Sequence, residues 1–290
     1  MRASRSPIRS LLVLVLLACG GNATGDKAPP QFVIVYTAIT DTDCRLVLAS
    51  LDGHLQSLPS ATCGDNPAWT RDGHRIAFEK HVGASALWSV NADGTGAAAL
   101  PGGDGLELPE WSPDGGQIAA IAEATGTIVI MNANGTGRID LPASIVTGNR
   151  PSWSNDGASI LFAMHDTLRT VTVGTGEVHV VAVPSVTGVS LPRWSPDQSR
   201  ISFIARTPDR LGVYVIDADG SNERLLIDTD VASSAAWSPD GRSLVYAAAF
   251  SPGFANDIFV LASDGSGTID TLTSNVLPQN SYAPDWARTR

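Results

Sequence analysis

Three observations predict an all-β fold in which one small unit repeats around a closed ring. The segment EWSPDGGQIA at 110–119 recurs as AWTRDGHRIA from 68, SWSNDGASIL from 152, RWSPDQSRIS from 193 and AWSPDGRSLV from 236. Tryptophans recur every 41 to 49 residues, a period typical of solenoids, propellers and arrays. Between the turns lie short runs of β-branched and aromatic residues with period two, and no helical period is sustained after residue 30.

The strands of each unit follow from these runs. A first run comes directly after the tryptophan turn, as in RIAFEK (75–80), RISFIA (200–205) and SLVYAA (243–248). A second run ends in a turn-forming pair, as in ALWSVNADG (86–94), GVYVIDADG (212–220) and DIFVLASDG (257–265). With the tryptophan segment and a final strand, a unit of about 42 residues has room for four strands.

The chemistry of the turns explains the repeated letters. In Ser-Pro-Asp-Gly, proline fixes φ, aspartate accepts local backbone hydrogen bonds, and glycine adopts the positive φ that closes the hairpin. Asp-Gly or Asn-Gly at 93–94, 134–135, 219–220 and 264–265 predicts a second tight hairpin between strands three and four. The tryptophan before each first turn offers a rigid surface that fills the space between neighbouring sheets.

The two ends of the repeat array predict how the ring closes. Residues 32–58 hold three strand-like runs without a preceding tryptophan turn, whereas YAPDWAR (282–288) holds a tryptophan strand without successors. Joined, they complete one blade, which removes the free sheet edge. We therefore expect a six-bladed β-propeller over 32–290, with blade tryptophans at Trp69, Trp111, Trp153, Trp194, Trp237 and Trp286.

The N-terminus predicts export and a lipid anchor. Residues 1–18 combine three arginines, no acid and a short apolar run, as in a bacterial signal peptide. LLAC at 16–19 resembles a lipobox, which implies lipidation of Cys19, followed by a flexible tether over 19–31. The alternative is an ordinary secretory peptide with an incidental cysteine. By the usual sorting rule, Gly20 after the lipidated cysteine would direct the protein to the outer membrane of a two-membrane cell.

The charge of the chain limits the classes of partner that it can bind, and its cysteines predict a disulfide. The full chain carries a net charge of −10, and removal of residues 1–18 takes away basic residues only. Because nucleic-acid binding needs clustered Lys and Arg, a nucleic-acid partner is excluded. Cys44 and Cys63 form an even pair in an exported chain, which predicts one disulfide. Two buried thiols are the alternative.

The repeated Trp-Ser-Pro-Asp-Gly turn, with its following strand and Asp-Gly hairpin, resembles the TolB-type, WD-like propeller repeat over about 32–288. The resemblance implies six blades. Departures are Thr70-Arg71 for Ser-Pro, Asn155 for Pro, Gln198 for Gly, and a third unit whose later hairpin (168–178) lacks Asp-Gly. The TolB family has an additional α/β domain before its propeller and works with a peptidoglycan-associated lipoprotein. Only a short tether precedes residue 32, so the Tol role is not transferred.

The predicted binding side carries the variable connections, at 62–67, 79–85, 101–109, 143–151, 206–212 and 248–257. Polar residues that enter the first strand of each blade would form a mixed-charge channel mouth, namely Asn66, Glu110, Arg150, Arg193 and Asp230. The alternative is that these are solvated loop residues. Phe250 and Phe254 could dock a protein or fold back on the last blade.

Catalytic and metal-binding motifs are weak. Neither Gly-x-Ser-x-Gly nor His-Glu-x-x-His occurs in the sequence. His81 and His165 have no paired carboxylates and do not make a set of metal ligands, so we expect no cofactor and no metal. The sequence favours a monomeric, membrane-tethered, non-catalytic module of the periplasm or cell envelope that binds a protein, peptide or glycan. The alternative is a propeller hydrolase or lyase with a site at the channel mouth, for which convergent acids and histidines would be the sign.

Overall fold

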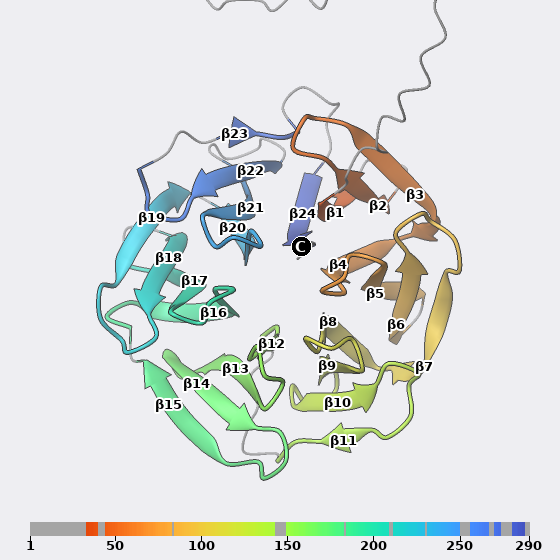
Figure 1. The fold of residues 1–290 in the computed structure, drawn as a ribbon, viewed down its shortest axis with the longest axis horizontal. Helices are drawn as coiled ribbons and strands as arrows, with labels where there is room; N and C mark the ends of the chain where they lie inside the picture. Colours follow the sequence, from red (N-terminus) through yellow and green to blue (C-terminus); the bar gives the residue numbers. More distant parts are fainter. Residues whose placement is uncertain are drawn as a thin grey trace, which may run out of the picture.

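The computed structural model describes residues 33–39, 44–82, 84–142, 149–182, 184–208, 211–229, 231–249, 256–266, 270–273 and 280–287. Their strands form six four-stranded sheets around a central axis, so the predicted six-bladed β-propeller is confirmed (Figure 1). All of the regular elements among these residues are strands. Accordingly, this part of the chain contains no helix that could span a membrane.

The blades are numbered along the chain, and within each the innermost strand is given first. Blade 1 contains β24 (Asn280–Trp286), β1 (Ile34–Ile39), β2 (Cys44–Ala49) and β3 (Leu55–Thr62). Blade 2 contains β4 (Gly64–Trp69), β5 (Arg75–Val82), β6 (Ala84–Asn91) and β7 (Ala98–Asp104). Blade 3 contains β8 (Leu106–Trp111), β9 (Gln117–Ala122), β10 (Ile128–Asn132) and β11 (Ile139–Asp140).

Blade 4 contains β12 (Ser152–Trp153), β13 (Ser159–Met164), β14 (Thr167–Thr172) and β15 (Val178–Ala182). Blade 5 contains β16 (Thr187–Trp194), β17 (Arg200–Arg206), β18 (Leu211–Asp217) and β19 (Arg224–Thr229). Blade 6 contains β20 (Val231–Trp237), β21 (Ser243–Ala249), β22 (Asp257–Ala262) and β23 (Asp270–Thr271).

The ring closes through blade 1, which combines both ends of the propeller. β24 pairs antiparallel with β1, and Trp286 stands opposite Ile34 in the register. In Figure 1 the blue β24 lies beside the red β1 at the inner edge of this blade. The predicted closure by three early strands and one late strand is confirmed, and β24 gives blade 1 the innermost strand that each of the other blades has.

The tryptophans pack between blades, as their positions predict. Each of six buried apolar clusters contains one repeat tryptophan together with residues of the preceding blade. Trp111, for example, lies against Ala68 and Leu87 of blade 2. Removing such a side chain leaves a cavity and costs about 3–5 kcal/mol. The tryptophans therefore join separate small sheets into one ring.

The first turn of each complete unit forms a shared hydrogen-bond pattern. In blade 3, Ser112 Oγ donates to Asp114 Oδ1 over 2.6 Å, and the same Oδ1 accepts from Gly116 N over 2.9 Å. Gly115 adopts a φ of 69°, and Gln198 adopts a φ of 59° at the matching position of blade 5. The side of the ring that carries these turns is the turn side, and the opposite side is the loop side.

Two features differ from the sequence-based expectation. The later hairpin of blade 4 forms although it lacks Asp-Gly, because Gly176 supplies the positive φ at 71° and β14 pairs with β15, with one register shift at Leu168 and Arg169. Three connections expected to be loop-side insertions are mostly strand. Residues 62–67 are divided between β3 and β4, residues 79–85 between β5 and β6, and residues 101–109 between β7 and β8.

Candidate binding site in the propeller channel

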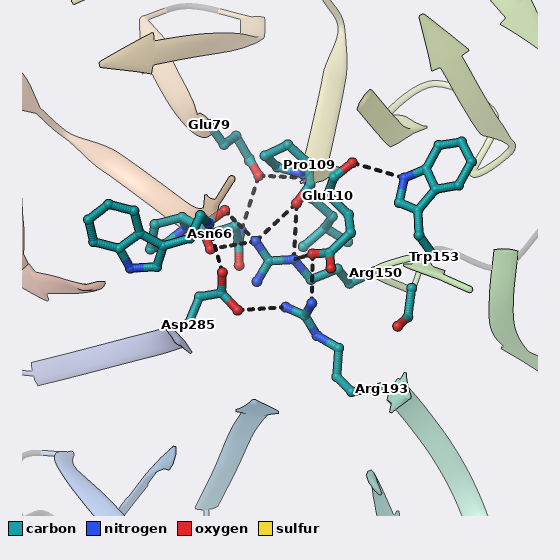
Figure 2. Close-up of polar contacts among 12 residues, drawn as sticks. Asn66, Glu79, Pro109, Glu110, Arg150, Trp153, Arg193 and Asp285 are labelled. Carbon is teal, nitrogen blue, oxygen red and sulfur yellow. Dashed lines mark hydrogen bonds and ion pairs between the residues drawn. The ribbon is translucent and has the colours of Figure 1, made fainter. Parts of the chain in front are cut away.

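In each blade, one residue of the innermost strand stands directly before the repeat tryptophan. These residues are Ala68, Glu110, Ser152, Arg193, Ala236 and Asp285. Of this set, Glu110, Arg193, Ala236 and Asp285 line one cavity, whereas Ala68 packs between blades 2 and 3 beside Trp111. Figure 2 shows Glu110, Arg193 and Asp285 converging on one another. Three blades therefore bring charge to the channel at one level.

A recurrent bulge precedes this level. The residue three positions before the tryptophan has a positive φ in four blades, at Asn66 (48°), Leu108 (54°), Leu191 (50°) and Ala283 (47°), and a proline follows each of them. The strand register shifts at the same places. A bulge locally disrupts the ladder between two strands, so backbone groups there become available to other donors.

Arg150 uses carbonyls at two of these bulges. Its Nη2 donates to Asn66 O over 2.7 Å and to Pro67 O over 2.6 Å, and its Nε donates to Pro109 O over 3.2 Å. The side chain is only 1% exposed, and its Nε lies 3.9 Å from Glu110 Oε2. Burial lowers the pKa of Arg150 to about 10, so the guanidinium stays charged at neutral pH. It joins blades 2, 3 and 4.

Arg193 makes the second set of bridges. Its Nη1 donates to Glu110 Oε2 over 2.6 Å, and its Nη2 lies 3.6 Å from Asp285 Oδ1. Burial alone would lower the pKa of Arg193, but Glu110 and Asp285 outweigh it and raise the pKa. Asp285 Oδ2 also accepts from Trp69 N over 2.8 Å. The network in Figure 2 therefore links blades 1 to 5 around the axis.

A cavity of about 40 Å³ adjoins this network. Glu110, Arg193 and Asp285 line it together with all six repeat tryptophans. Arg71 and Pro113, which belong to the turns after the tryptophans of blades 2 and 3, line it as well. The cavity therefore lies at the turn-side end of the channel, not at the loop side that the sequence favours.

A different cluster occupies the loop side. Glu79, on β5, is 3% exposed and accepts hydrogen bonds from Asn66 Nδ2 over 3.0 Å and Leu108 N over 3.3 Å. Its Oε1 lies 2.8 Å from Nε2 of His81, whose side chain is 52% exposed. Ser85 Oγ lies 3.2 Å from the other ring nitrogen. An acid and a histidine thus meet at this mouth.

The predicted site residues are distributed as follows. Glu110, Arg150 and Arg193 converge in one network. Asn66 belongs to it as well, because its backbone carbonyl accepts from Arg150 and its side-chain amide donates to Glu79. Asp230, Cys19, Phe250 and Phe254 lie outside the described residues. Sequence reasoning missed Asp285, although it precedes its tryptophan just as Glu110 does. It also missed Glu79, which only the strand register brings to the channel, opposite Asp65.

Cys44 opens β2, and Cys63 directly follows β3. Cys44 and Cys63 are thiols in this structure, and Cys63 N donates to Cys44 O over 2.7 Å. Burial is the main cause that raises the pKa of Cys44 to about 11. Within the described ranges, no group of three or more His, Cys, Asp or Glu side chains has a geometry that could hold a metal ion.

Among the comparisons with known proteins, the one with solved structures supports the fold. No family model matches the chain, and no curated protein matches it. TolB from Acinetobacter baumannii superposes with a TM-score of 0.78 at 19% identity, over 88% of this chain and 66% of that one. The chain thus spans slightly less than two thirds of that TolB. A protein designated TolB from Agrobacterium tumefaciens gives 0.62 at 15% identity, over 88% and 99% of the two chains.

An oligogalacturonate lyase in complex with manganese is also similar, with a TM-score of 0.54 at 18% identity over 84% of this chain and 73% of that one. At such identities the likeness establishes the fold alone. The chain has a TolB-like propeller, and the same architecture occurs in an enzyme. Function must therefore be inferred from the residues of the site and not from the fold.

Proposed function

We propose that this protein is a non-catalytic binding module of the bacterial cell envelope that holds a protein, peptide or glycan at a mouth of its channel. The observation that carries the proposal is the convergence of Glu110, Arg193 and Asp285, from three different blades, on one small cavity. Buried charges cost free energy that apolar residues in a simple structural plug would not. Charges kept at such a place are better explained by recognition of a polar partner.

We further propose that a lipid on Cys19 tethers the module to a membrane, with residues 19–31 as the flexible link. The lipobox-like LLAC at 16–19 supports this part. Metabolic labelling with a fatty-acid analogue tests it: the unaltered protein should carry label and sediment with membranes. A Cys19→Ser variant should lose the label. Equal label on both proteins would refute the anchor.

Site-specific photocrosslinking in the producing cells tests the binding role. A photoreactive amino acid replaces Arg71 at the turn-side mouth, His81 at the loop-side mouth, or Val180, which is 58% exposed on β15 at the outer rim. We expect a discrete crosslinked species from a mouth position and none from position 180. Crosslinks of the same pattern from all three positions, or only from the rim, would contradict binding at the channel.

A second candidate function is a lyase or hydrolase that acts at the loop-side mouth. The contact of 2.8 Å between Glu79 and the half-exposed His81 favours it, because a carboxylate orients a histidine for proton transfer. The similar fold of an oligogalacturonate lyase makes acidic oligosaccharides the first substrates to test. Activity that is lost on His81→Gln, with the fold intact, would support this role. Absence of any turnover, with and without added manganese, would remove it.

A further inference from the structure

Arg193 has an unused hydrogen-bonding edge. Its Nη1 is bonded to Glu110, whereas its Nε and Nη2 are buried and have no hydrogen-bond partner among the described residues. Asp285 Oδ1, at 3.6 Å from Nη2, is near enough for charge attraction but too far for a hydrogen bond. Nε and Nη2 together form the planar fork with which a guanidinium binds a carboxylate through two parallel bonds.

Further donors near the same cavity are also unsatisfied. The indole Nε1 atoms of Trp69, Trp111 and Trp194 are buried and unpaired, and so is Nη1 of Arg150. By contrast, Trp153 and Trp237 donate to the carbonyls of Glu110 and Arg193. A buried donor without an acceptor costs about 1–3 kcal/mol. Several such donors around one cavity indicate that an acceptor group belongs there.

The unsatisfied donors favour a ligand with a single negative charge. The cavity lining itself is neutral, since Arg71 and Arg193 stand beside Glu110 and Asp285, and behind it Arg150 is accompanied by the buried Glu79. A dianion such as phosphate would be repelled by the two carboxylates already present. With a volume of about 40 Å³, the cavity has room for a carboxylate group but not for a sugar ring.

We propose that the channel cavity binds the carboxylate of a polypeptide, which enters from the turn side and pairs with Nε and Nη2 of Arg193. The inference deepens the proposed binding function and rests on it. Arg71 has a defined place in this scheme. It occupies the turn position at which blades 3, 5 and 6 have proline, and it brings an exposed positive charge to the cavity entrance.

NMR of the indole N–H groups tests the inference on residues 32–290, which contain all six blades. The probe is acetyl-Ala-Ala-Ala with a free C-terminal carboxylate, and its C-terminal amide is the matched control at equal ionic strength. We expect the free acid to move resonances of the cavity tryptophans with at least about tenfold higher affinity than the amide. Trp88, on β6 and outside the cavity lining, serves as the internal reference and should not move.

Two variants separate recognition from folding. Arg71→Pro restores the common turn residue, so it should fold normally and bind the free acid several-fold more weakly. Arg193→Lys keeps the charge but lacks the fork, and should abolish the difference between acid and amide. The inference is overturned if acid and amide act alike on the unaltered protein, if chloride reproduces the shifts, or if Trp88 moves with the rest. Mouth-specific photocrosslinks would then still support the binding function, with a different ligand group.

Discussion

Arg193 Nη1 on blade 5 lies 2.6 Å from Glu110 Oε2 on blade 3, a hydrogen-bonded ion pair between two innermost strands separated by blade 4. The second guanidinium, that of Arg150, reaches the same Glu110 oxygen at 3.9 Å. One carboxylate therefore compensates two buried cations. This makes Glu110 the most sensitive member of the channel network.

Glu110→Gln should destabilise the propeller by about 3–5 kcal/mol, because it leaves two buried guanidinium groups without their shared counter-charge. Urea unfolding measures the loss. The double variant Glu110→Leu with Arg193→Met removes both charges of the pair and should recover only part of the loss, because Arg150 and Asp285 then lack a counter-charge. Glu177→Gln, an exposed acid on the connection between β14 and β15, is the matched control and should change stability by less than about 0.5 kcal/mol. A small effect of Glu110→Gln would show that the pair is not coupled to folding.

Gln198→Gly should stabilise the protein by about 0.5–1 kcal/mol. Gln198 holds a φ of 59°, which penalises side chains with a Cβ, whereas blades 2, 3, 4 and 6 use glycine at this turn position. Thermal unfolding of the two proteins measures the gain. Gln198→Ala keeps the strained backbone without the glutamine side chain and should bring no gain. If alanine stabilised as much as glycine, the backbone explanation would be wrong.

Stability should fall as the pH drops from about 4 toward 2. Hydrogen bonds from turn hydroxyls lower the pKa of Asp72, Asp114, Asp156, Asp197 and Asp240, that of Asp197 to about 2. A group with a lowered folded-state pKa contributes stability above its unfolded pKa and loses that contribution as the pH falls through the folded pKa. Urea midpoints between pH 2 and 5 measure this. In Ser195→Ala, which lacks the main donor to Asp197, the slope should be shallower, and an unchanged slope would contradict the assignment.

Oxidised glutathione should join Cys44 and Cys63, and it accepts the two electrons and two protons that the thiols release. We expect the bond to add about 3 kcal/mol, because it closes a short loop in the unfolded chain. In the reduced protein, the exposed Cys63 should be alkylated first, since burial holds the pKa of Cys44 near 11. Mass spectrometry after alkylation, with and without reductant, follows both steps. Equal alkylation of oxidised and reduced samples would contradict the bridge.

The ring itself was predictable because its determinants are local. The Ser-Pro-Asp-Gly turn and the tryptophan spacing specify each blade. Trp286 could be assigned to blade 1 because residues 32–58 supply only three of the four strands that a blade needs. These patterns act within about forty residues. They are also tolerant, since Gly176 replaces a missing Asp-Gly turn in blade 4 without loss of a strand.

The site was predictable only in part. Glu110, Arg150 and Arg193 were accessible because they enter innermost strands, but their level in the channel depends on a bulge. Its sequence mark, a proline two residues before the tryptophan, also occurs at Pro151, which follows Arg150 without a positive φ. Leu108 and Ala283 adopt a positive φ at the bulge, although neither is a typical residue for that conformation. The bulge gives Arg150 its carbonyl partners and makes it a buried bridge, not an exposed residue of the loop-side mouth.

A crystal structure of residues 32–290 grown with acetyl-Ala-Ala-Ala, free at its C-terminal carboxylate, tests the role of the channel most directly. We predict that the peptide enters from the turn side, beside Arg71, and that its carboxylate oxygens lie within hydrogen-bond distance of Arg193 Nε and Nη2. A structure in which only water occupies that edge, with the peptide absent or bound on another surface, would contradict the channel as the site of recognition.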